Sequence, residues 1–179
     1  WPRAVVVTAD QPSPVAVYAA EELVARIEKS TGAQLEIVRE SDVSADDTRV
    51  RVHVGDTRAA RNEGLDPGNL PGETYRIKAV DGNLYILGNE DGKQLFPDET
   101  DKDYYSAVVR GTRRGTLYGV VDFLERSVGV RWLWPGELGT YVPRQESVTV
   151  DAGLDVNKGP AFKFREYRIG GIRRSIVRG

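Results

Sequence analysis

Residues 111–143 read GTRRGTLYGVVDFLERSVGVRWLWPGELGTYVP, and this stretch decides the fold. Apolar residues recur in it at helical spacing and predict a helix with one apolar face, made of Leu117, Val120, Val121, Leu124 and Val128. Gly115 and Gly119 stand four residues apart. Glycine inside a helix costs about 1 kcal/mol relative to alanine, so the pair predicts a backbone packed very close to a neighbour. Gly129 predicts the helix end, because glycine adopts the left-handed cap conformation without steric penalty.

The residues after Gly129 alternate in a way that predicts a strand. Val130, Trp132 and Trp134 alternate with Arg131 and Leu133, and Pro135-Gly136 predicts a turn. Trp132 and Trp134 would then share one face of the strand. If that face is exposed, the two rings offer a stacking platform for a sugar. If it is buried, they belong to the core or to a contact with a neighbouring domain, and we favour this second interpretation.

The first forty residues predict a β-α-β unit. Residues 3–8 (RAVVVT) form a β-branched run typical of a buried strand. Ser13-Pro14 gives a helix N-cap followed by proline at the first helical position. Gly32 is the expected helix end, and residues 34–39 (QLEIVR) are a second expected strand. The apolar stripe of the helix comprises Ala16, Ala20, Leu23 and Ile27.

The middle of the chain adds further strands. Residues 49–54 (RVRVHV) alternate strictly, which places the valines inward and His53 outward. A short helix is expected at 58–63, and a hairpin of 74–80 with 83–87 around Asp81-Gly82. Residues 104–110 and 147–150 are expected to add strands, the latter at an edge. This order predicts an α/β (α+β) fold with a single mixed β-sheet and two long helices packed on one face.

Composition bounds the possible functions. The chain has 179 residues, enough for one domain with a real core. Its 25 Lys and Arg against 27 Asp and Glu give a net charge of −2, which favours neither nucleic acid nor an anionic membrane as partner. No apolar run approaches the roughly 18 residues that a membrane span needs. The chain has no Cys, hence no thiolate metal site. It also has no Met, so we expect that a signal peptide has been removed or the chain has been trimmed.

No residue pattern predicts catalysis, a metal or a cofactor in this chain. His53 is the only histidine, and its strand position favours a surface or interface role over a catalytic triad. Asp122 and Glu125 are interpreted as helix-surface carboxylates, with Asp122 facing Arg126 one turn later. The acidic residues 89–103 lack the spacing of a calcium loop and favour a solvated loop. An arginine cluster before the central helix either binds an anion or caps the turn, and we favour the cap; it consists of Arg110, Arg113 and Arg114.

The quoted stretch also carries a family resemblance. Its pattern G-T-x-x-G-x-L-Y-G-V-x-x-F-L-E-x-x-x-G-V-R-W-x-x-P-G-E resembles the N-terminal α/β domain of α-glucuronidases and of related uncharacterised bacterial glycoside-hydrolase-like proteins. A related domain precedes the barrel in β-N-acetylhexosaminidases. The resemblance covers residues 4–168. It implies that residues 1–155 are a non-catalytic N-terminal domain of β-N-acetylhexosaminidase-like fold. Residues 156–179 would link it to the start of a truncated downstream (β/α) barrel.

Residues 160–168 (PAFKFREYR) are similar to the segment that enters the first barrel strand in β-N-acetylhexosaminidases. By that similarity Arg165 would bind substrate hydroxyls in the parent protein. The family continues with Gly-x-x-x-Asp, whereas Glu166 follows here.

The resemblance implies an accessory domain that packs against the catalytic barrel of the same chain. The parent would be a bacterial glycoside hydrolase acting on uronic-acid or N-acetylhexosamine linkages of a polysaccharide or glycan, in the periplasm or outside the cell. Its catalytic carboxylates would lie beyond Gly179. Two alternatives stay open: a stand-alone carbohydrate-binding or adaptor module that uses the Trp132/Trp134 face, and an enzyme in its own right.

Overall fold

The computed structural model describes residues 3–44, 46–91, 113–134 and 136–161, and a six-stranded sheet organises them. The strand order is β2-β1-β3-β5-β4-β8. The first four of these strands pair in parallel, and β4 pairs antiparallel with both β5 and β8. The predicted mixed sheet is confirmed. The strand bounds, in chain order, are β1 (Ala4–Thr8), β2 (Ile37–Arg39), β3 (Val50–Val54), β4 (Tyr75–Val80), β5 (Asn83–Gly88) and β8 (Asp155–Lys158).

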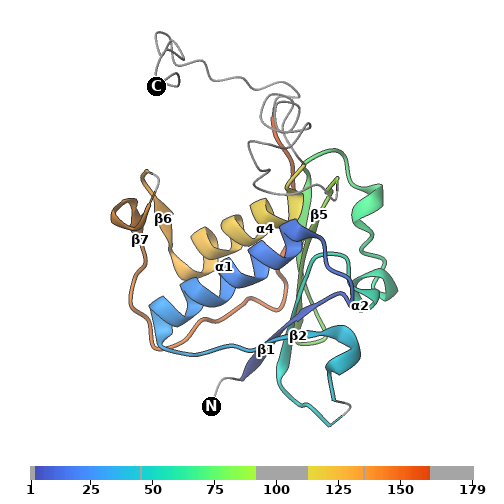
Figure 1. Cartoon of the computed structure of the whole chain (residues 1–179), viewed down its shortest axis with the longest axis horizontal. Coiled ribbons are helices and arrows are strands. Elements are labelled where there is room, and N and C mark those ends of the chain that lie inside the picture. The colour runs from blue at the N-terminus through green and yellow to red at the C-terminus, as the bar shows by residue number, and fades with distance from the viewer. Residues whose placement is uncertain (1–2, 45, 92–112, 135, 162–179) are drawn as a thin grey trace, which may run out of the picture.

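Two long helices lie side by side on one face of the sheet, as predicted (Figure 1). Helix α1 (Pro14–Thr31) begins at Ser13, whose hydroxyl accepts the Ala16 amide, and ends at Gly32 with a φ of 77°. Helix α4 (Gly115–Phe123) continues as a π-helical turn, η3 (Leu124–Val128), and stops at Gly129 with a φ of 81°. Both glycines hold the left-handed conformation that ends a helix at no steric cost.

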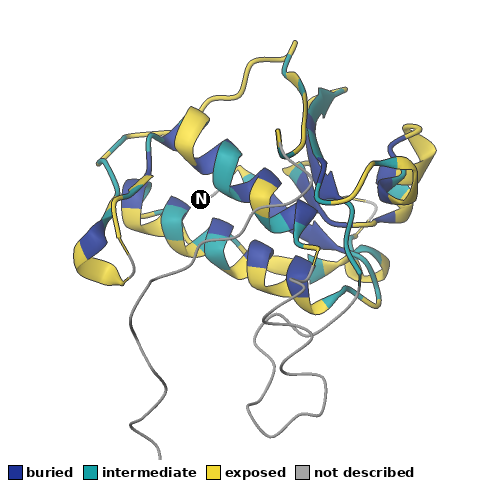
Figure 2. Cartoon of the chain, turned by 90° about the horizontal axis from the view of Figure 1, so that it is seen from above, coloured by how far each residue is buried: buried dark blue, intermediate teal, exposed yellow. Residues whose placement is uncertain are grey.

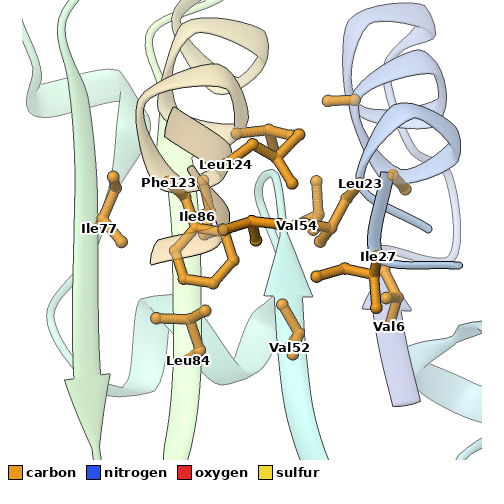
Figure 3. Packing of buried hydrophobic residues seen from close by; sticks show 14 of the residues in the cluster. Val6, Leu23, Ile27, Val52, Val54, Ile77, Leu84, Ile86, Phe123 and Leu124 are labelled. Carbon is orange, nitrogen blue, oxygen red and sulfur yellow. The ribbon is translucent and has the colours of Figure 1, made fainter. Parts of the chain in front are cut away.

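The main core lies between these helices and the sheet (Figure 3). Alternate strand residues face the helices, and each helix turns toward the sheet the apolar stripe expected from its periodicity. In Figure 2 buried residues line the side of each helix that faces the sheet, while the outer sides are exposed. The labelled core residues of Figure 3 are Val6, Val52, Val54, Ile77, Leu84 and Ile86 from the sheet, and Leu23, Ile27, Phe123 and Leu124 from the helical layer.

The close backbone approach predicted from Gly115 and Gly119 is confirmed. A Cβ on Gly115 would lie 2.6 Å from the Asn89 amide nitrogen and 2.7 Å from the Thr74 carbonyl oxygen. A Cβ on Gly119 would lie 2.9 Å from Cγ2 of Ile86. The first turn of α4 therefore rests directly on the backbone at the ends of β4 and β5.

The opposite face of the sheet is partly covered too, and this makes the prediction for His53 wrong. Helix α2 (Arg58–Asn62) and the 3₁₀ turn η2 (Pro67–Asn69) follow β3, and a second small core forms there from Ala60, Leu65, Tyr85 and Leu87. The His53 side chain points to this side, is only 4% exposed, and stacks on the Tyr85 ring at 4.7 Å. Strict alternation separates the two faces of a strand but does not say that the second face meets water.

The sheet edges depart from the sequence predictions. Residues 147–150 form no strand; the edge strand beside β4 is β8, so the sheet continues past the expected boundary at residue 155. Strand β2 keeps three of the six residues expected for it. Val50, expected inward, is 43% exposed at the first position of β3. The predicted strand 104–110 and most of the acidic segment lie outside the described residues.

Candidate functional site

A hairpin built from the Trp-rich stretch projects from the body of the domain beyond the ends of the two helices (Figure 1). Its strands are β6 (Arg131–Trp132) and β7 (Thr140–Tyr141), joined through the 3₁₀ turn η4 (Glu137–Gly139). They form a separate two-stranded sheet, in which Trp132 pairs with Thr140. The predicted strand is therefore real but short, and Trp134 lies after it rather than on it.

The two tryptophans differ in their surroundings. Trp132 is half-buried and packs against the main core, together with Val142. Trp134 is 65% exposed, and Leu138 is 98% exposed. Leu133 and Tyr141 are exposed as well. We call the four exposed residues Leu133, Trp134, Leu138 and Tyr141 the hairpin tip. Four large exposed apolar residues therefore fall between positions 133 and 141.

The hairpin is held to helix α1 by charge. The Glu137 carboxylate in η4 accepts a 2.7 Å contact from Lys29 Nζ and a 3.5 Å contact from Arg26 Nη1. The hydrogen bond from Lys29 and its positive charge lower the pKa of Glu137. Inside the hairpin the Leu133 amide donates to the Gly139 carbonyl at 2.7 Å. These contacts orient the tip away from the sheet.

The segment that follows β7 is fixed to the ends of both long helices. The Ser30 hydroxyl donates to the Pro143 carbonyl at 2.6 Å, and the Gln145 amide donates to the Ser30 carbonyl at 3.0 Å. The Gln145 side chain donates to the Val128 carbonyl at 2.6 Å. These hydrogen bonds fix the base of the hairpin to the ends of the two long helices, whereas its tip is exposed.

A second candidate site is a cleft of about 340 Å³ at the carboxyl ends of β1, β3 and β5. Helix α1 carries the chain from β1 to β2 on one side, and the chain then returns to β3 on the other side of β1. The carboxyl ends of β1 and β3 therefore form a topological switch point, where open α/β sheets place their ligand sites. The polar residues that line the cleft include Ser13, Asp56, Arg61, Asp66, Asn89 and Glu90.

The carboxyl group of Glu90 lies partly buried in the wall of the cleft. The Ser13 hydroxyl donates to its Oε2, and its Oε1 is buried from solvent. Burial raises the pKa of Glu90, and the hydrogen bonds from Ser13 and Thr116 offset part of that rise. The neighbouring Asn89 donates its amide to the carbonyls of Leu70, at 2.8 Å, and Pro67, at 3.3 Å, and leaves its Oδ1 buried without a partner.

The ionised side chains of the cleft already have partners. Arg61 Nε donates to Asp56 Oδ1 at 2.6 Å and its Nη2 lies 2.5 Å from Asp56 Oδ2. Asp66 caps η2 by accepting the Gly68 amide at 2.8 Å and the Asn69 side chain at 3.1 Å. The charges of Asp56, Arg61 and Asp66 in the cleft are therefore compensated by partners within the chain.

The structure does not gather the remaining sequence candidates into one site. Asp122 pairs with Arg126 at 3.0 Å, as expected from their spacing, and with Lys158 at 3.5 Å. Burial lowers the pKa of His53 to about 4, so at neutral pH it is an uncharged part of the core. Arg114 precedes the first turn of α4, and the Arg113 amide donates to Asp91 at 3.2 Å. Arg110 and Arg165 lie outside the described residues.

In the part of the chain that the structure describes, no three His, Cys, Asp or Glu side chains group as metal ligands would. None of its helices is long and apolar enough to cross a membrane.

Sequence reasoning missed both Leu138 in the tip and the pair Asn89 and Glu90 in the cleft. A signal for the second was present, since polar residues directly follow β5 at the carboxyl end of a strand in a parallel arrangement. This signal identifies the cleft only when the strand order is known, and the strand order cannot be read from a single sequence.

Comparison with known proteins finds likeness in structure only. No protein-family model matches the sequence, and no curated protein sequence matches it. Among solved structures, a family GH115 4-O-methyl-α-glucuronidase with specificity for decorated arabinogalactans matches with a TM-score of 0.51 and 14% identity. The match covers 89% of this chain and 18% of that one. A GH138 enzyme targeting pectin rhamnogalacturonan II matches over 69% of this chain and 10% of that one, with a TM-score of 0.36 and 15% identity.

The chain therefore spans less than a fifth of the glucuronidase that it matches. The sequence pattern of residues 111–137 suggested a resemblance to α-glucuronidases. The structural likeness confirms this resemblance at the level of the fold. This α/β domain has the fold of a part of a glycoside hydrolase.

Proposed function

We propose that this chain is a non-catalytic accessory domain of a larger bacterial glycoside hydrolase, and that its hairpin tip packs against a catalytic domain that follows it. The observation that carries the proposal is the exposure of the tip. Leu138 is 98% exposed and Leu133 is 73% exposed on a hairpin whose base is firmly anchored. Covering a side chain of this kind is worth about 1.5–3 kcal/mol.

The rigid support of the tip favours a permanent contact. A hairpin bound to α1 through Glu137 and to the core through Trp132 presents its apolar side chains with little conformational entropy left to lose. The similarity to a short part of a GH115 enzyme agrees with a role inside a longer chain.

Under this proposal the catalytic carboxylates belong to the following domain, a (β/α) barrel, and the substrate is a polysaccharide or glycan. Residues 156–179 lead toward that barrel, and Arg165 serves its substrate pocket. A parent that degrades such polymers works in the periplasm or outside the cell.

The test is a two-piece binding experiment. The 179-residue chain and the segment encoded downstream of it are produced separately, and their association is measured by calorimetry. We expect binding that Leu138→Ser weakens by about 10- to 100-fold, because the tip loses a buried anchor. Val17→Ser, on the outer surface of α1, is the matched control. Equal affinity for wild type and Leu138→Ser would refute the role of the tip.

Trp134 supports a second candidate function, a carbohydrate-binding or adaptor module. The residue is 65% exposed, and an exposed indole ring can stack on a sugar. Oligosaccharides titrated into the isolated chain would then change its tryptophan fluorescence in a saturable way, and Trp134→Ala would abolish the change. Tryptophan fluorescence that does not change during the titration would refute this candidate and would not affect the packing role. Turnover of aryl glycosides by the isolated chain would instead make it an enzyme.

A further inference from the structure

Arg131 stands on the outward face of the hairpin. In the ladder of β6 and β7 it lies directly opposite Tyr141, whereas Trp132 lies opposite Thr140. Successive residues of a strand point to opposite faces, and directly opposed residues share a face. Because Trp132 packs against the main core, the side chains of Arg131 and Tyr141 point away from it, and both residues are exposed. An arginine therefore stands beside one member of the hairpin tip.

The backbone before β6 holds the Arg131 guanidinium in place. Its Nη1 donates to the carbonyl of Glu125, in η3, at 2.9 Å and to the carbonyl of Val130 at 2.7 Å. A guanidinium has five N–H donors, so the N–H of Nε and the two of Nη2 are left over. Within the described part of the chain these three donors make no hydrogen bond. Arg131 thus combines a fixed position with unused donors.

The charge of Arg131 has no counterpart among the described residues. No carboxylate of that part of the chain forms an ion pair with it, and Glu125 gives it only a backbone carbonyl. The carboxylate of the same hairpin, Glu137, is already paired with Lys29 and Arg26. The outward face of the hairpin therefore joins exposed apolar side chains to an uncompensated positive charge.

A carboxylate is the group that the unused edge of Arg131 fits. Nε and Nη2 form one edge of the guanidinium, and elsewhere in this chain the same edge binds a carboxylate, in the pair of Arg61 with Asp56 and in the pair of Arg76 with Asp155. Such bidentate, charge-assisted pairs are roughly twice as strong as hydrogen bonds between neutral groups. Arginine is also enriched, with tryptophan and tyrosine, among the residues that dominate interface energies.

We propose that Arg131 anchors the interface between the hairpin tip and the following catalytic domain, and that this domain presents an aspartate or glutamate carboxylate to the Nε and Nη2 edge. The inference rests on the proposed packing of the tip. It adds the chemistry of the partner surface, which carries an acidic side chain next to the apolar area that receives Leu138.

The two-piece calorimetry tests the anchor with three variants. Arg131→Gln removes the charge and the bidentate edge, and should raise the Kd at least about tenfold. Arg131→Lys keeps the charge without the edge, and should raise the Kd several-fold, less than Arg131→Gln does. Arg39→Gln is the matched control, because it removes the same charge from an exposed position on β2, and it should leave the Kd unchanged.

Salt distinguishes an ion pair from a structural role. The wild-type association should weaken as NaCl rises from about 50 mM to about 500 mM, and it should weaken less in Arg131→Gln. A side chain that only caps the carbonyls of Glu125 and Val130 would change the unfolding free energy of the isolated chain and leave the salt dependence of the association as it is.

An equal Kd for wild type and Arg131→Gln, or the same salt dependence in both, would overturn the inference. If Leu138→Ser still weakens the association in that case, the accessory role stands without this anchor. If Arg131→Gln does not fold, Arg131→Lys decides, and an unchanged Kd overturns the inference. Wild-type pieces that do not associate would refute the accessory role and the anchor together.

Discussion

Replacing Gly115 by alanine tests how α4 is seated on the sheet. The new Cβ would lie 2.6 Å from the amide nitrogen of Asn89, 2.8 Å from its carbonyl oxygen and 2.7 Å from the carbonyl oxygen of Thr74. All three are backbone atoms, which no side-chain rotation can move aside. Overpacking of this kind costs about 1–3 kcal/mol and occasionally more. The shift would also strain the 3.1 Å hydrogen bond from the Gly115 amide to the Asn89 carbonyl.

Alanine gains less than about 1 kcal/mol of helix propensity here, because Gly115 is the first residue of α4. We therefore expect Gly115→Ala to lower the free energy of unfolding by about 1–3 kcal/mol, out of the roughly 5–15 kcal/mol typical of a domain. Urea denaturation followed by tryptophan fluorescence measures this loss as a lower midpoint with an unchanged slope.

Gly119→Ala is the matched control. Its Cβ would meet the Ile86 side chain at 2.9 Å and Cβ of Tyr75 at 3.3 Å, and the position lies inside the helix, where alanine gains its full propensity. We expect a net change within about 1 kcal/mol. A Gly115→Ala protein as stable as wild type, or no more destabilised than Gly119→Ala, would refute this packing of α4.

Two more predictions concern stability. The pKa of His53 falls from 6.5 to about 4 in the folded chain, so the unfolded chain binds more protons between these values and stability is lost as the pH falls through this range. Urea titrations from pH 7 to pH 4 should show a loss of about 2–3 kcal/mol that is missing in His53→Phe; equal pH dependence in both would contradict the burial of His53. Ser13→Ala removes the N-cap of α1 and the hydroxyl bound to Glu90, and should cost about 1–2 kcal/mol of unfolding free energy. Ser147→Ala, at an exposed position, should leave the free energy of unfolding unchanged. An equal loss of unfolding free energy in both variants would show that Ser13 does not stabilise α1 as its cap.

The features that could be predicted from the sequence are those encoded by short-range chemistry. Ser13-Pro14 and Gly32 bound α1, and Asp81-Gly82 turns the hairpin, because each places a required conformation or cap within a few residues. The pair Gly115 and Gly119 predicted close packing, because glycine destabilises a helix and its presence there is explained by a neighbour that leaves no room for a Cβ.

The features that could not be predicted depend on segments far apart in the chain. His53 is covered by the ring of Tyr85 from β5 and lies beside the Thr57 hydroxyl, and no local pattern predicts the first of these contacts. Residues 147–150 have the β-branched composition of a strand, yet the position beside β4 is taken by Asp155–Lys158, which has little of it. Pairing there is set by tertiary context rather than by propensity.

The same limit applies to the two candidate sites. The cleft exists because β1, β3 and β5 end side by side, which follows from strand order. In the hairpin, the short length of β6 separates Trp132 from Trp134, so that one ring supports the core and the other reaches solvent. Alternation alone placed both rings on one face.

The central claim is that the hairpin tip is covered in the parent protein. Amide hydrogen exchange, measured by mass spectrometry, compares the 179-residue chain with the longer chain encoded by its gene. We predict that peptides spanning residues 133–141 exchange at least about tenfold more slowly in the longer chain, while peptides of β1 and α1 exchange equally in both. Equal exchange of residues 133–141 in the two proteins, or a gene that ends at residue 179, would contradict the claim.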